Sequence, residues 1–334
     1  MKRAFVLGWL FLFAVTAWAA PLRMYFIDVE GGQSTLIVSP SGASMLIDAG
    51  WRGFDGRDAK RILEAAKSAG IDRIDYLIVT HYHADHVGGV PELAGKIKIG
   101  TFVDHGPNRE DADDTRANYA AYLKAIGDAK HLVVKPGDRI PINGLDVTVV
   151  SADGNLITKP LSGAGEENPL CASEPAPPDG PSENSHSLGV LITYGKLRVL
   201  DIGDLTKKKE LGLACPKNLV GKVDLFVVTH HGSVGSNPKA FVHAIAPRVA
   251  IMDNGAHKGG SPESWQTVHD SPGLADLWQL HYAMNSGDDH NVAKDFIANL
   301  EENCTGKSIT VTGEADGTVT VTNSRNGFFK TYKK

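Results

Sequence analysis

The sequence predicts a protein of the α/β class, because strands and helices alternate along most of the chain. An amphipathic helix is expected over Arg57–Ala69, with Gly70 ending it. The continuous apolar run Ile74–Thr80 predicts a fully buried strand. Three earlier runs, rich in β-branched and aromatic residues and separated by turn signals, predict strands at Leu22–Val29, Ser34–Val38 and Ser44–Asp48.

The second half of the chain repeats this alternation. Further strands are expected at Val190–Tyr194, Leu197–Ile202, Val223–Val228, Ser308–Thr312 and Thr318–Thr322, the last two joined by a hairpin turn. The stretch Asp153–Asn184 is rich in Gly and Pro and should lack regular structure.

The stretch Asn254–Asn291 is also expected to be a long loop, because it mixes His, Trp and Gly residues. Ordered loops of this composition often shape binding sites, so His257 and Trp265 are predicted to contact substrate. Simple packing of these side chains is the alternative.

The N-terminus has the pattern of a secretory signal peptide. Lys2 and Arg3 precede the apolar run Ala4–Val15, and Ala17-Trp18-Ala19 resembles a cleavage site. We therefore expect residues 1–19 to be removed, which leaves one domain over residues 20–334 in the periplasm or the medium. A membrane anchor is the alternative, but the run is shorter than the roughly 20 residues of a spanning helix. No stable membrane association is expected after cleavage.

Composition limits the classes of partner. The full chain has a formal net charge of −5, and loss of Lys2 and Arg3 would make it about −7. Nucleic acid is therefore expected only as a substrate. The three cysteines, Cys171, Cys215 and Cys304, predict either one disulfide with one free thiol or three buried thiols.

The segment from His81 to His86 carries the clearest chemical signal. His81, His83, Asp85 and His86 follow directly on the predicted buried strand. So many ligand-type groups at one strand end would repel one another or stay unsatisfied without a cation between them. Imidazole and carboxylate ligands suit Zn²⁺, and they also suit Mn²⁺ or Fe²⁺.

These residues form the motif His-x-His-x-Asp-His, and with it the sequence resembles the metallo-β-lactamase superfamily. Within that superfamily it is most similar to the ComEC-type competence proteins and their stand-alone relatives. One departure is Gln33, where the competence proteins have an acidic residue. The other segments that carry the resemblance are Phe26–Ser34, Leu46–Gly50, Asn184–Ser187, Gly203-Asp204 and His230–Ser233.

The resemblance implies an αββα sandwich with two divalent metal ions at one edge. The predicted strands agree with this arrangement, because three of them end within two residues of His81, Asp204 and His230-His231. Asp204 would bridge the two metals.

The resemblance also implies a role for each residue of the first motif. His81 and His83 would hold the first metal, and Asp85 and His86 would hold the second. Asp48 would orient the cluster as an outer carboxylate, since ligating imidazoles usually donate their other N–H to an oxygen. An ordinary turn residue is the alternative for Asp48.

The later motifs supply the remaining groups. We expect His231 to complete the second metal's ligands and His230 to face the substrate as a proton donor, a role open to His257 as well. His186 is either a third ligand of the first metal or no ligand at all, in which case Asn184 or water takes that place.

The predicted activity is metal-dependent hydrolysis of a phosphodiester or a related small-molecule ester, with Asp85, Asp204 and His230 as the residues that carry catalysis. Two cations can share a hydroxide and stabilise the attacking and leaving oxygens. A β-lactamase, or a lactone or thioester hydrolase, is the enzymatic alternative. A non-catalytic metal-bound binding module is the alternative of another class.

Overall fold

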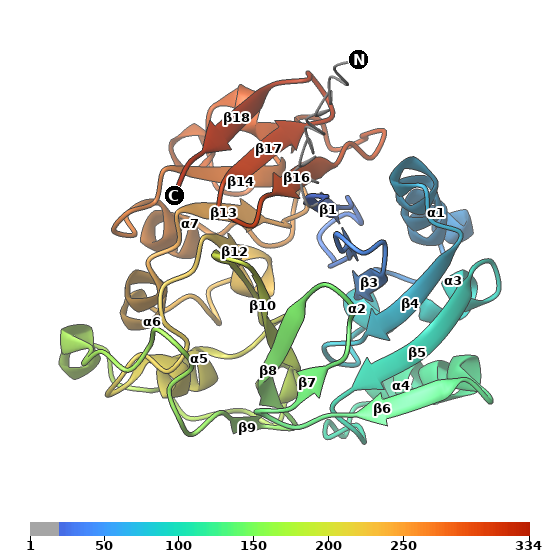
Figure 1. Ribbon diagram of the computed structural model, residues 1–334, viewed down its shortest axis with the longest axis horizontal. Coiled ribbons are helices and arrows are strands. Elements are labelled where there is room, and N and C mark those ends of the chain that lie inside the picture. Colours follow the sequence, from blue (N-terminus) through green and yellow to red (C-terminus); the bar gives the residue numbers. More distant parts are fainter. Residues whose placement is uncertain (1–19) are drawn as a thin grey trace, which may run out of the picture.

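Two β-sheets pack face to face in residues 20–334, the part of the chain that the computed structural model describes (Figure 1). The predicted signal peptide lies outside the described residues. Sheet A has nine strands in the order β18-β17-β16-β1-β2-β3-β4-β5-β6. These strands are β1 (Leu22–Phe26), β2 (Thr35–Val38), β3 (Ser44–Ile47), β4 (Arg73–Ile78), β5 (Lys98–Asp104), β6 (Lys130–Val133), β16 (Ile309–Gly313), β17 (Val319–Asn323) and β18 (Phe329–Tyr332).

Sheet B follows the order β15-β14-β13-β12-β11-β10-β8-β7, with β9 paired to β8. Strands β11 to β15 run parallel, as β3 to β6 do in sheet A. The strands of sheet B are β7 (Arg139–Ile140), β8 (Asp146–Ala152), β9 (Asn155–Leu156), β10 (Gly189–Tyr194), β11 (Leu197–Asp201), β12 (Leu225–Val227), β13 (Val249–Met252), β14 (Asp276–His281) and β15 (Ile297–Asn299).

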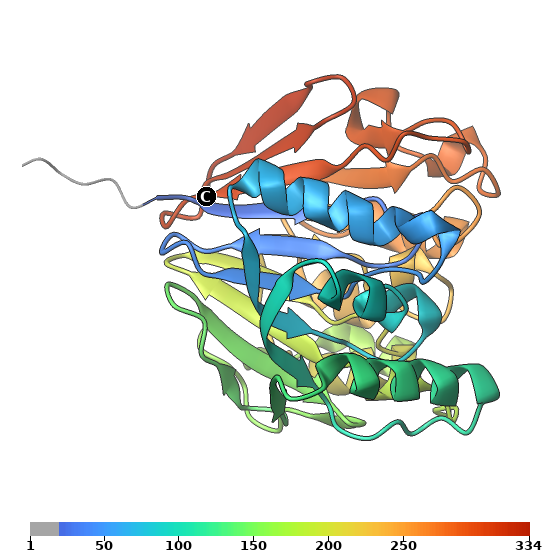
Figure 2. The same cartoon turned by 90° about the vertical axis from the view of Figure 1, so that its right-hand side faces the viewer.

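Helices cover the outer face of each sheet. Helices α1, α3 and α4 pack on sheet A, and Figure 2 shows α1 in blue and α4 in green across that face. Helices α5, α6 and α7 pack on sheet B. The helices are α1 (Arg57–Ala69), α2 (Ala84–Val87), α3 (Val90–Ala94), α4 (Asp113–Ile126), α5 (Lys207–Ala214), α6 (Lys239–Ile245) and α7 (Pro262–His269). Short 3₁₀ turns are η1 (Phe54–Gly56), η2 (Pro169–Ser173), η3 (Glu183–His186), η4 (Thr229–Gly232), η5 (Asp288–His290) and η6 (Lys294–Phe296).

Strands β2 and β3 are apolar on both faces because both of their faces are buried. In β3, Met45 and Ile47 point into the core between the sheets, whereas Leu46 points into the core under the helices. This alternation follows from the two-residue period of a strand. The order helix, sheet, sheet, helix is the predicted αββα sandwich, the metallo-β-lactamase fold.

Several expected elements agree with the structure, and the two predicted loops do not. The stretch Asp153–Asn184 contains the short elements β9 and η2, although it was expected to lack regular structure. Helix α1 and the hairpin of β16 and β17 lie where the sequence predicts them. The prediction of one long loop over Asn254–Asn291 is wrong, because α7 and β14 lie within it. In β14 the polar residues Gln279 and His281 are buried and hydrogen-bonded, which hides the apolar pattern of a strand.

Cys171 and Cys215 form a disulfide, and Cys304 is a free thiol. This is the first of the two arrangements that the sequence left open. Among the helices of residues 20–334, none has the length and apolar character needed to cross a membrane.

Candidate metal centre

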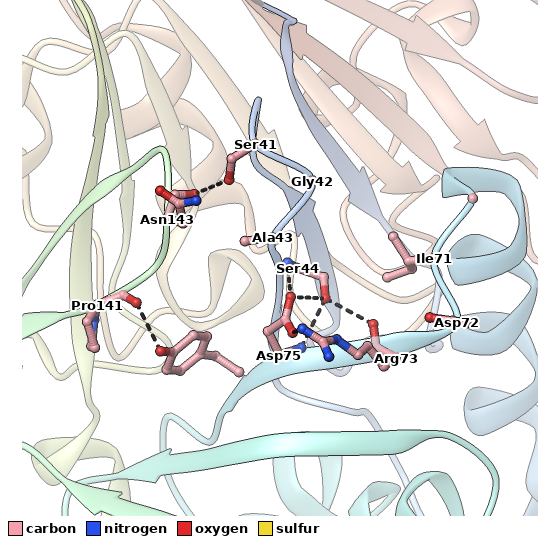
Figure 3. Close-up of a pocket in the computed structure, with 12 residues that line it drawn as sticks. Ser41, Gly42, Ala43, Ser44, Ile71, Asp72, Arg73, Asp75, Pro141 and Asn143 are labelled. Atoms are coloured by element: carbon pink, nitrogen blue, oxygen red, sulfur yellow. Dashed lines mark hydrogen bonds and ion pairs between the residues drawn. The ribbon is translucent and has the colours of Figure 1, made fainter.

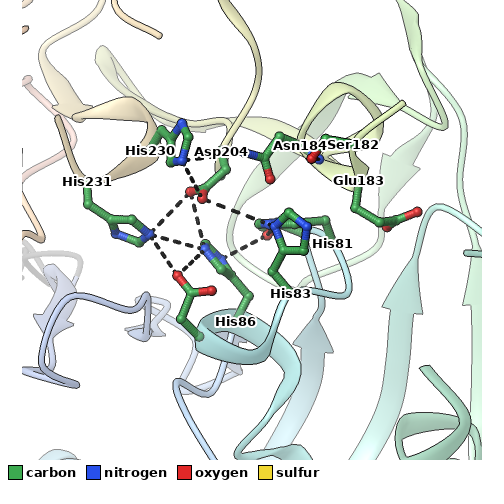
Figure 4. Close-up of polar contacts among 12 residues, drawn as sticks. His81, His83, His86, Ser182, Glu183, Asn184, Asp204, His230 and His231 are labelled. Atoms are coloured by element: carbon green, nitrogen blue, oxygen red, sulfur yellow. Dashed lines mark hydrogen bonds and ion pairs between the residues drawn. The ribbon is translucent and has the colours of Figure 1, made fainter. Parts of the chain in front are cut away.

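The histidine-rich motif and the later motifs meet at one edge of the sandwich (Figure 4). The segment from His81 to His86 follows β4, Asp204 follows β11, and His230 and His231 follow β12. The carboxyl ends of these strands therefore bring together side chains that are far apart in the sequence. Such strand ends are a common place for ligand sites in α/β proteins.

Two imidazoles form the first group of the site. His81 Nε2 lies 3.0 Å from His83 Nδ1. The hydroxyl of Thr80 donates to Asp48 Oδ2 at 2.6 Å, so it can only accept from His81 Nδ1, 3.0 Å away. His83 Nε2 donates to a carboxylate oxygen of Glu110 at 2.8 Å. The two nitrogens that face each other are therefore both lone-pair acceptors, which is favourable only with a cation between them.

The second group contains Asp85, His86, Asp204 and His231, whose donor atoms all lie within 4.8 Å of one another. His86 Nε2 is 3.2 Å from His231 Nε2 and 3.2 Å from Asp85 Oδ2. His86 also donates from Nδ1 to Asp48 at 2.7 Å, so its Nε2 faces the cluster. Imidazole and carboxylate groups in this number form a divalent-metal site.

Asp204 joins the two groups through its two oxygens. Its Oδ1 lies 3.2 Å from His86 Nε2 and 3.4 Å from His231 Nε2. Its Oδ2 lies 3.4 Å from His230 Nε2 and 3.9 Å from His81 Nε2. Oδ1 is buried without a hydrogen-bond partner. A carboxylate that presents one oxygen to each group has the arrangement of a metal bridge.

The backbone around η4 is unusual in a way that serves the site. His230 and His231 both have positive φ, 56° and 53°, a conformation rare for residues other than glycine. Because of this turn, the Nε2 atoms of the two neighbouring rings both approach Asp204. The sequence predicted that one of the two would face the substrate instead.

The remote nitrogens of these two rings face outer acceptors. His230 Nδ1 is 3.4 Å from Ser236 Oγ, whose hydroxyl donates to the carbonyl of Leu205 at 2.7 Å. His231 Nδ1 is 3.4 Å from Asp253 Oδ1 but forms no hydrogen bond with it. Of the two rings, only His230 thus has an outer hydrogen-bond partner that can fix its tautomer.

Charges within the site are strongly coupled. Burial raises the pKa of Asp204, but His86, His230 and His231 outweigh it and hold this pKa well below its ordinary value. Burial and the neighbouring His86 hold the pKa of His81 well below its ordinary value. The bridging carboxylate is therefore ionised and the His81 imidazole neutral, and both are the forms that bind metals.

Not all predicted site residues join this cluster. The Nδ2 atom of Asn184 lies 3.4 Å from His230 Nε2, so Asn184 borders the site. His186 turns toward Asp153, with 3.6 Å between His186 Nδ1 and Asp153 Oδ1. Trp265 packs in the core under α7, and His257 is half-exposed and pairs with Glu302 at 3.2 Å.

Three residues next to the site were missed by sequence reasoning: Glu110, Asp253 and Lys258. Asp253 directly follows β13, so the strand-end rule that indicated His81 and Asp204 would also have indicated it. Lys258 contacts Asp85 Oδ2 and directly follows His257, which the sequence predicts to contact substrate. Glu110 is one of several acidic residues in a polar loop, and nothing in the sequence around it indicates a role in the site.

A second cluster of ligand-type residues contains Asp28, Glu30, His281 and Cys304. Arg61 Nη1 lies 3.0 Å from a carboxylate oxygen of Asp28 and 3.0 Å from one of Glu30. The guanidinium thus supplies the positive charge that these carboxylates need. The cluster around Asp204 has no such guanidinium. Among the described residues, Lys258 is the one Lys or Arg that contacts a ligand-type side chain there.

A cavity of about 490 Å³ lies at the start of β3 and β4, whereas the histidines follow the end of β4 (Figure 3). Its polar groups are paired with one another. Ser44 Oγ donates to the carbonyl of Arg73 at 3.0 Å, and the Tyr76 hydroxyl donates to the carbonyl of Pro141 at 2.9 Å. The cavity therefore has a structural explanation and is not part of the candidate site.

Comparison with known proteins agrees with the fold and the motif. Residues 27–164 match the model of the metallo-beta-lactamase superfamily. Recombination protein 2 of Haemophilus influenzae is 29% identical over 231 residues, 69% of this chain and 24% of that protein. ComE operon protein 3 of Bacillus subtilis is 26% identical over 242 residues, 69% of this chain and 28% of that protein. The chain thus spans about a quarter of the length of these two relatives.

A hydroxyacylglutathione hydrolase of Rhodopseudomonas palustris is 30% identical over 123 residues, 36% of this chain and 39% of that protein. Among solved structures, a mutant of the CmlA beta-hydroxylase has a TM-score of 0.48 and 16% identity, and the match covers 78% of this chain and 52% of that one. The chain contains a metallo-β-lactamase domain. Its predicted resemblance to ComEC-type competence proteins is confirmed.

Proposed function

We propose that the protein is a two-metal hydrolase that cleaves phosphodiesters outside the cytoplasm. The observation that carries this proposal is the position of Asp204, whose two oxygens face two separate groups of imidazoles. Without cations, the inward-facing lone pairs of His81 and His83 would stay unsatisfied at 3.0 Å.

The two groups define which residues would hold each metal. His81, His83 and His230 would hold the first, with Asp204 Oδ2. The second would be held by Asp85, His86 and His231, with Asp204 Oδ1. His230 therefore takes the place that the sequence offered to His186. The donors are nitrogen and oxygen, which fits Zn²⁺, Mn²⁺ or Fe²⁺.

Two bound divalent ions would lower the pKa of a shared water and stabilise the charge that develops on the attacking and leaving oxygens. Other residues of the protein fix the orientation of the metal-binding side chains. Asp48 holds Thr80 and His86, and Glu110 holds His83. Asn184, beside His230, can donate a hydrogen bond to a substrate oxygen from its Nδ2.

The phosphodiester class is favoured by the two-metal arrangement with a bridging carboxylate, which suits in-line displacement at phosphorus. Thioester hydrolysis is the second candidate, because one relative is named hydroxyacylglutathione hydrolase. The two candidates differ in substrate but would use the same metal-binding residues.

The test compares substrates on one preparation. Metal-depleted protein is reloaded with Zn²⁺ or Mn²⁺ and assayed on bis(p-nitrophenyl) phosphate, nitrocefin, a lactone and S-lactoylglutathione. The proposal expects metal-dependent turnover that is fastest on the phosphodiester and is abolished in Asp204→Ala. Preference for the thioester would establish the second candidate. Binding of two metals without turnover of any substrate would indicate a binding module.

A location outside the cytoplasm is proposed from the predicted signal over residues 1–19 and is supported by the disulfide between Cys171 and Cys215. Expression of the full chain followed by N-terminal sequencing tests this part. We expect a mature protein that begins near Ala20 in the periplasm or the medium. An intact Met1 in the membrane fraction would contradict it.

A further inference from the structure

A cavity of about 590 Å³ is lined in part by Lys258, and the reaction proposed for the metal centre does not use it. Phe54, Arg57, His257 and Lys258 are among the residues that line it. The amino group of Lys258 contacts Asp85 Oδ2, an atom of the candidate metal site. The cavity therefore extends from Lys258, which contacts the candidate metal site, to Phe54, and its volume is typical of small-molecule sites.

Phe54 is presented to solvent by a strained turn. Its side chain is 65% exposed, although large aromatic side chains are normally buried. Four successive residues have positive φ: Gly53 at 92°, Phe54 at 50°, Asp55 at 54° and Gly56 at 70°. For Phe54 and Asp55 this conformation costs about 1 kcal/mol or more each, and strain of this kind gathers at functional sites.

The strained turn is held in place by its surroundings. Gly53 N donates to Glu92 Oε1 at 3.0 Å, and Trp51 N donates to Asp58 Oδ2 at 2.8 Å. The Arg57 guanidinium lies 4.5 Å from the centre of the Phe54 ring. Arg57 also pairs with Asp58 Oδ1 at 2.6 Å, so the exposed Phe54 ring supplies the flat surface on which an aromatic group can stack.

The positive charges of the cavity are not equally available. Arg61 pairs with Asp28 and Glu30, and His257 pairs with Glu302. Lys258, among the described residues, pairs only with Asp85, which would itself bind metal. Lys258 would then be repelled by the metal and attracted by an anionic oxygen of a substrate.

From these observations, we propose that this cavity is a substrate subsite for a flat aromatic group attached to a phosphate, as in a nucleotide. Lys258 binds a phosphate oxygen, and Phe54 stacks against the ring. The inference rests on the proposed phosphodiesterase function, because the phosphate of the same substrate would react at the metal centre.

Calorimetric titration of the metal-loaded protein with two matched ligands tests the subsite. Adenosine 5′-monophosphate and ribose 5-phosphate differ only in the base. Stacking of one base contributes about a tenfold gain in affinity. We expect wild-type protein to bind the nucleotide about tenfold more tightly, and Phe54→Ala to reduce this ratio to about one while Phe54→Trp keeps it. Phe329→Ala is the matched control, since Phe329 in β18 is also 65% exposed.

Lys258→Met should weaken the binding of both ligands by about tenfold, with an unchanged ratio. Equal affinities in the wild type, an unchanged ratio in Phe54→Ala, or no binding of either ligand would each overturn the subsite. The proposed function has a separate readout, the turnover of bis(p-nitrophenyl) phosphate by the wild type. Turnover without a base preference overturns only the subsite, whereas absence of turnover overturns the proposed function.

Discussion

Gln33 donates from Nε2 to both carboxylate oxygens of Asp201, at 2.8 and 2.7 Å, although 168 residues separate the two. Both side chains are buried. The contact ties the glycine turn before β2 in sheet A to the end of β11 in sheet B, three residues before Asp204. Burial raises the pKa of Asp201 to about 7, even though Gln33 donates to it.

Gln33→Glu should therefore destabilise the protein by about 3 kcal/mol at pH 8, because two buried carboxylates would face each other. Since the pKa of Asp201 in the folded state lies above its ordinary value, stability from this site is lost as pH rises and recovers as pH falls to 6. Urea unfolding at both pH values measures the effect. Gln266→Glu is the control, because Gln266 donates to one carboxylate oxygen of Asp270 on the surface. Equal losses in the two variants would refute this role of Gln33.

Asp48→Asn should weaken metal binding by about 10- to 100-fold, because Asp48 fixes the tautomer of His86 and also accepts from Thr80. Competition with a chromophoric chelator gives the affinity. Asp104→Asn is the control, since Asp104 is also buried and accepts from His131 at 2.6 Å. That variant should lose stability and keep its metal affinity. A similar loss of affinity in both variants would show that the effect on metal binding is only structural.

The carboxyl group of Glu210 should make the free energy of unfolding depend on pH, independently of metal binding. It is fully buried, and burial raises its pKa to about 8. A folded-state pKa above the ordinary value of 4.5 means that the folded state holds an extra proton, so the free energy of unfolding falls as pH rises toward 8.

Glu210→Gln should remove this fall. Relative to wild type, the variant should gain about 2 kcal/mol between pH 6 and pH 8. The exposed Glu263→Gln serves as control and should show no such gain. Parallel curves for Glu210→Gln and wild type would mean that Glu210 is ionised at both pH values.

The metal content of two variants shows whether His230 or His186 binds the first metal. His230→Ala should retain about one metal equivalent, because His230 Nε2 lies 3.4 Å from Asp204 Oδ2. His186→Ala should retain two, because His186 turns toward Asp153. Elemental analysis after gel filtration gives the stoichiometry. Two equivalents and slow turnover in His230→Ala would instead support the proton-transfer role that the sequence suggested.

Local motifs were readable from the sequence, but pairings between distant segments were not. His81, His83, Asp85 and His86 share one strand end, so their spacing alone indicated a metal site. The partners that fix their tautomers come from other segments. Glu110 belongs to a polar loop with no pattern, and Ser236 is one serine among many.

Errors in the loop predictions have a similar cause. The sequence predicts that Trp265 contacts substrate because it stands among His and Gly residues, yet it packs in the core through α7. Its burial depends on sheet B, which forms from strands on both sides of it in the sequence. Gln33 was visible as a departure from the competence proteins, but its partner Asp201 could be found only in the folded chain.

In the proposed function, Asp204 bridges two metals held by separate histidine groups. Electron paramagnetic resonance of protein loaded with two equivalents of Mn²⁺ tests it most directly, because ions about 3.5–4 Å apart are magnetically coupled. We predict the spectrum of a coupled pair in the wild type and of uncoupled Mn²⁺ in Asp204→Ala. A wild-type spectrum of isolated Mn²⁺ only, at two bound equivalents, would contradict the bridge.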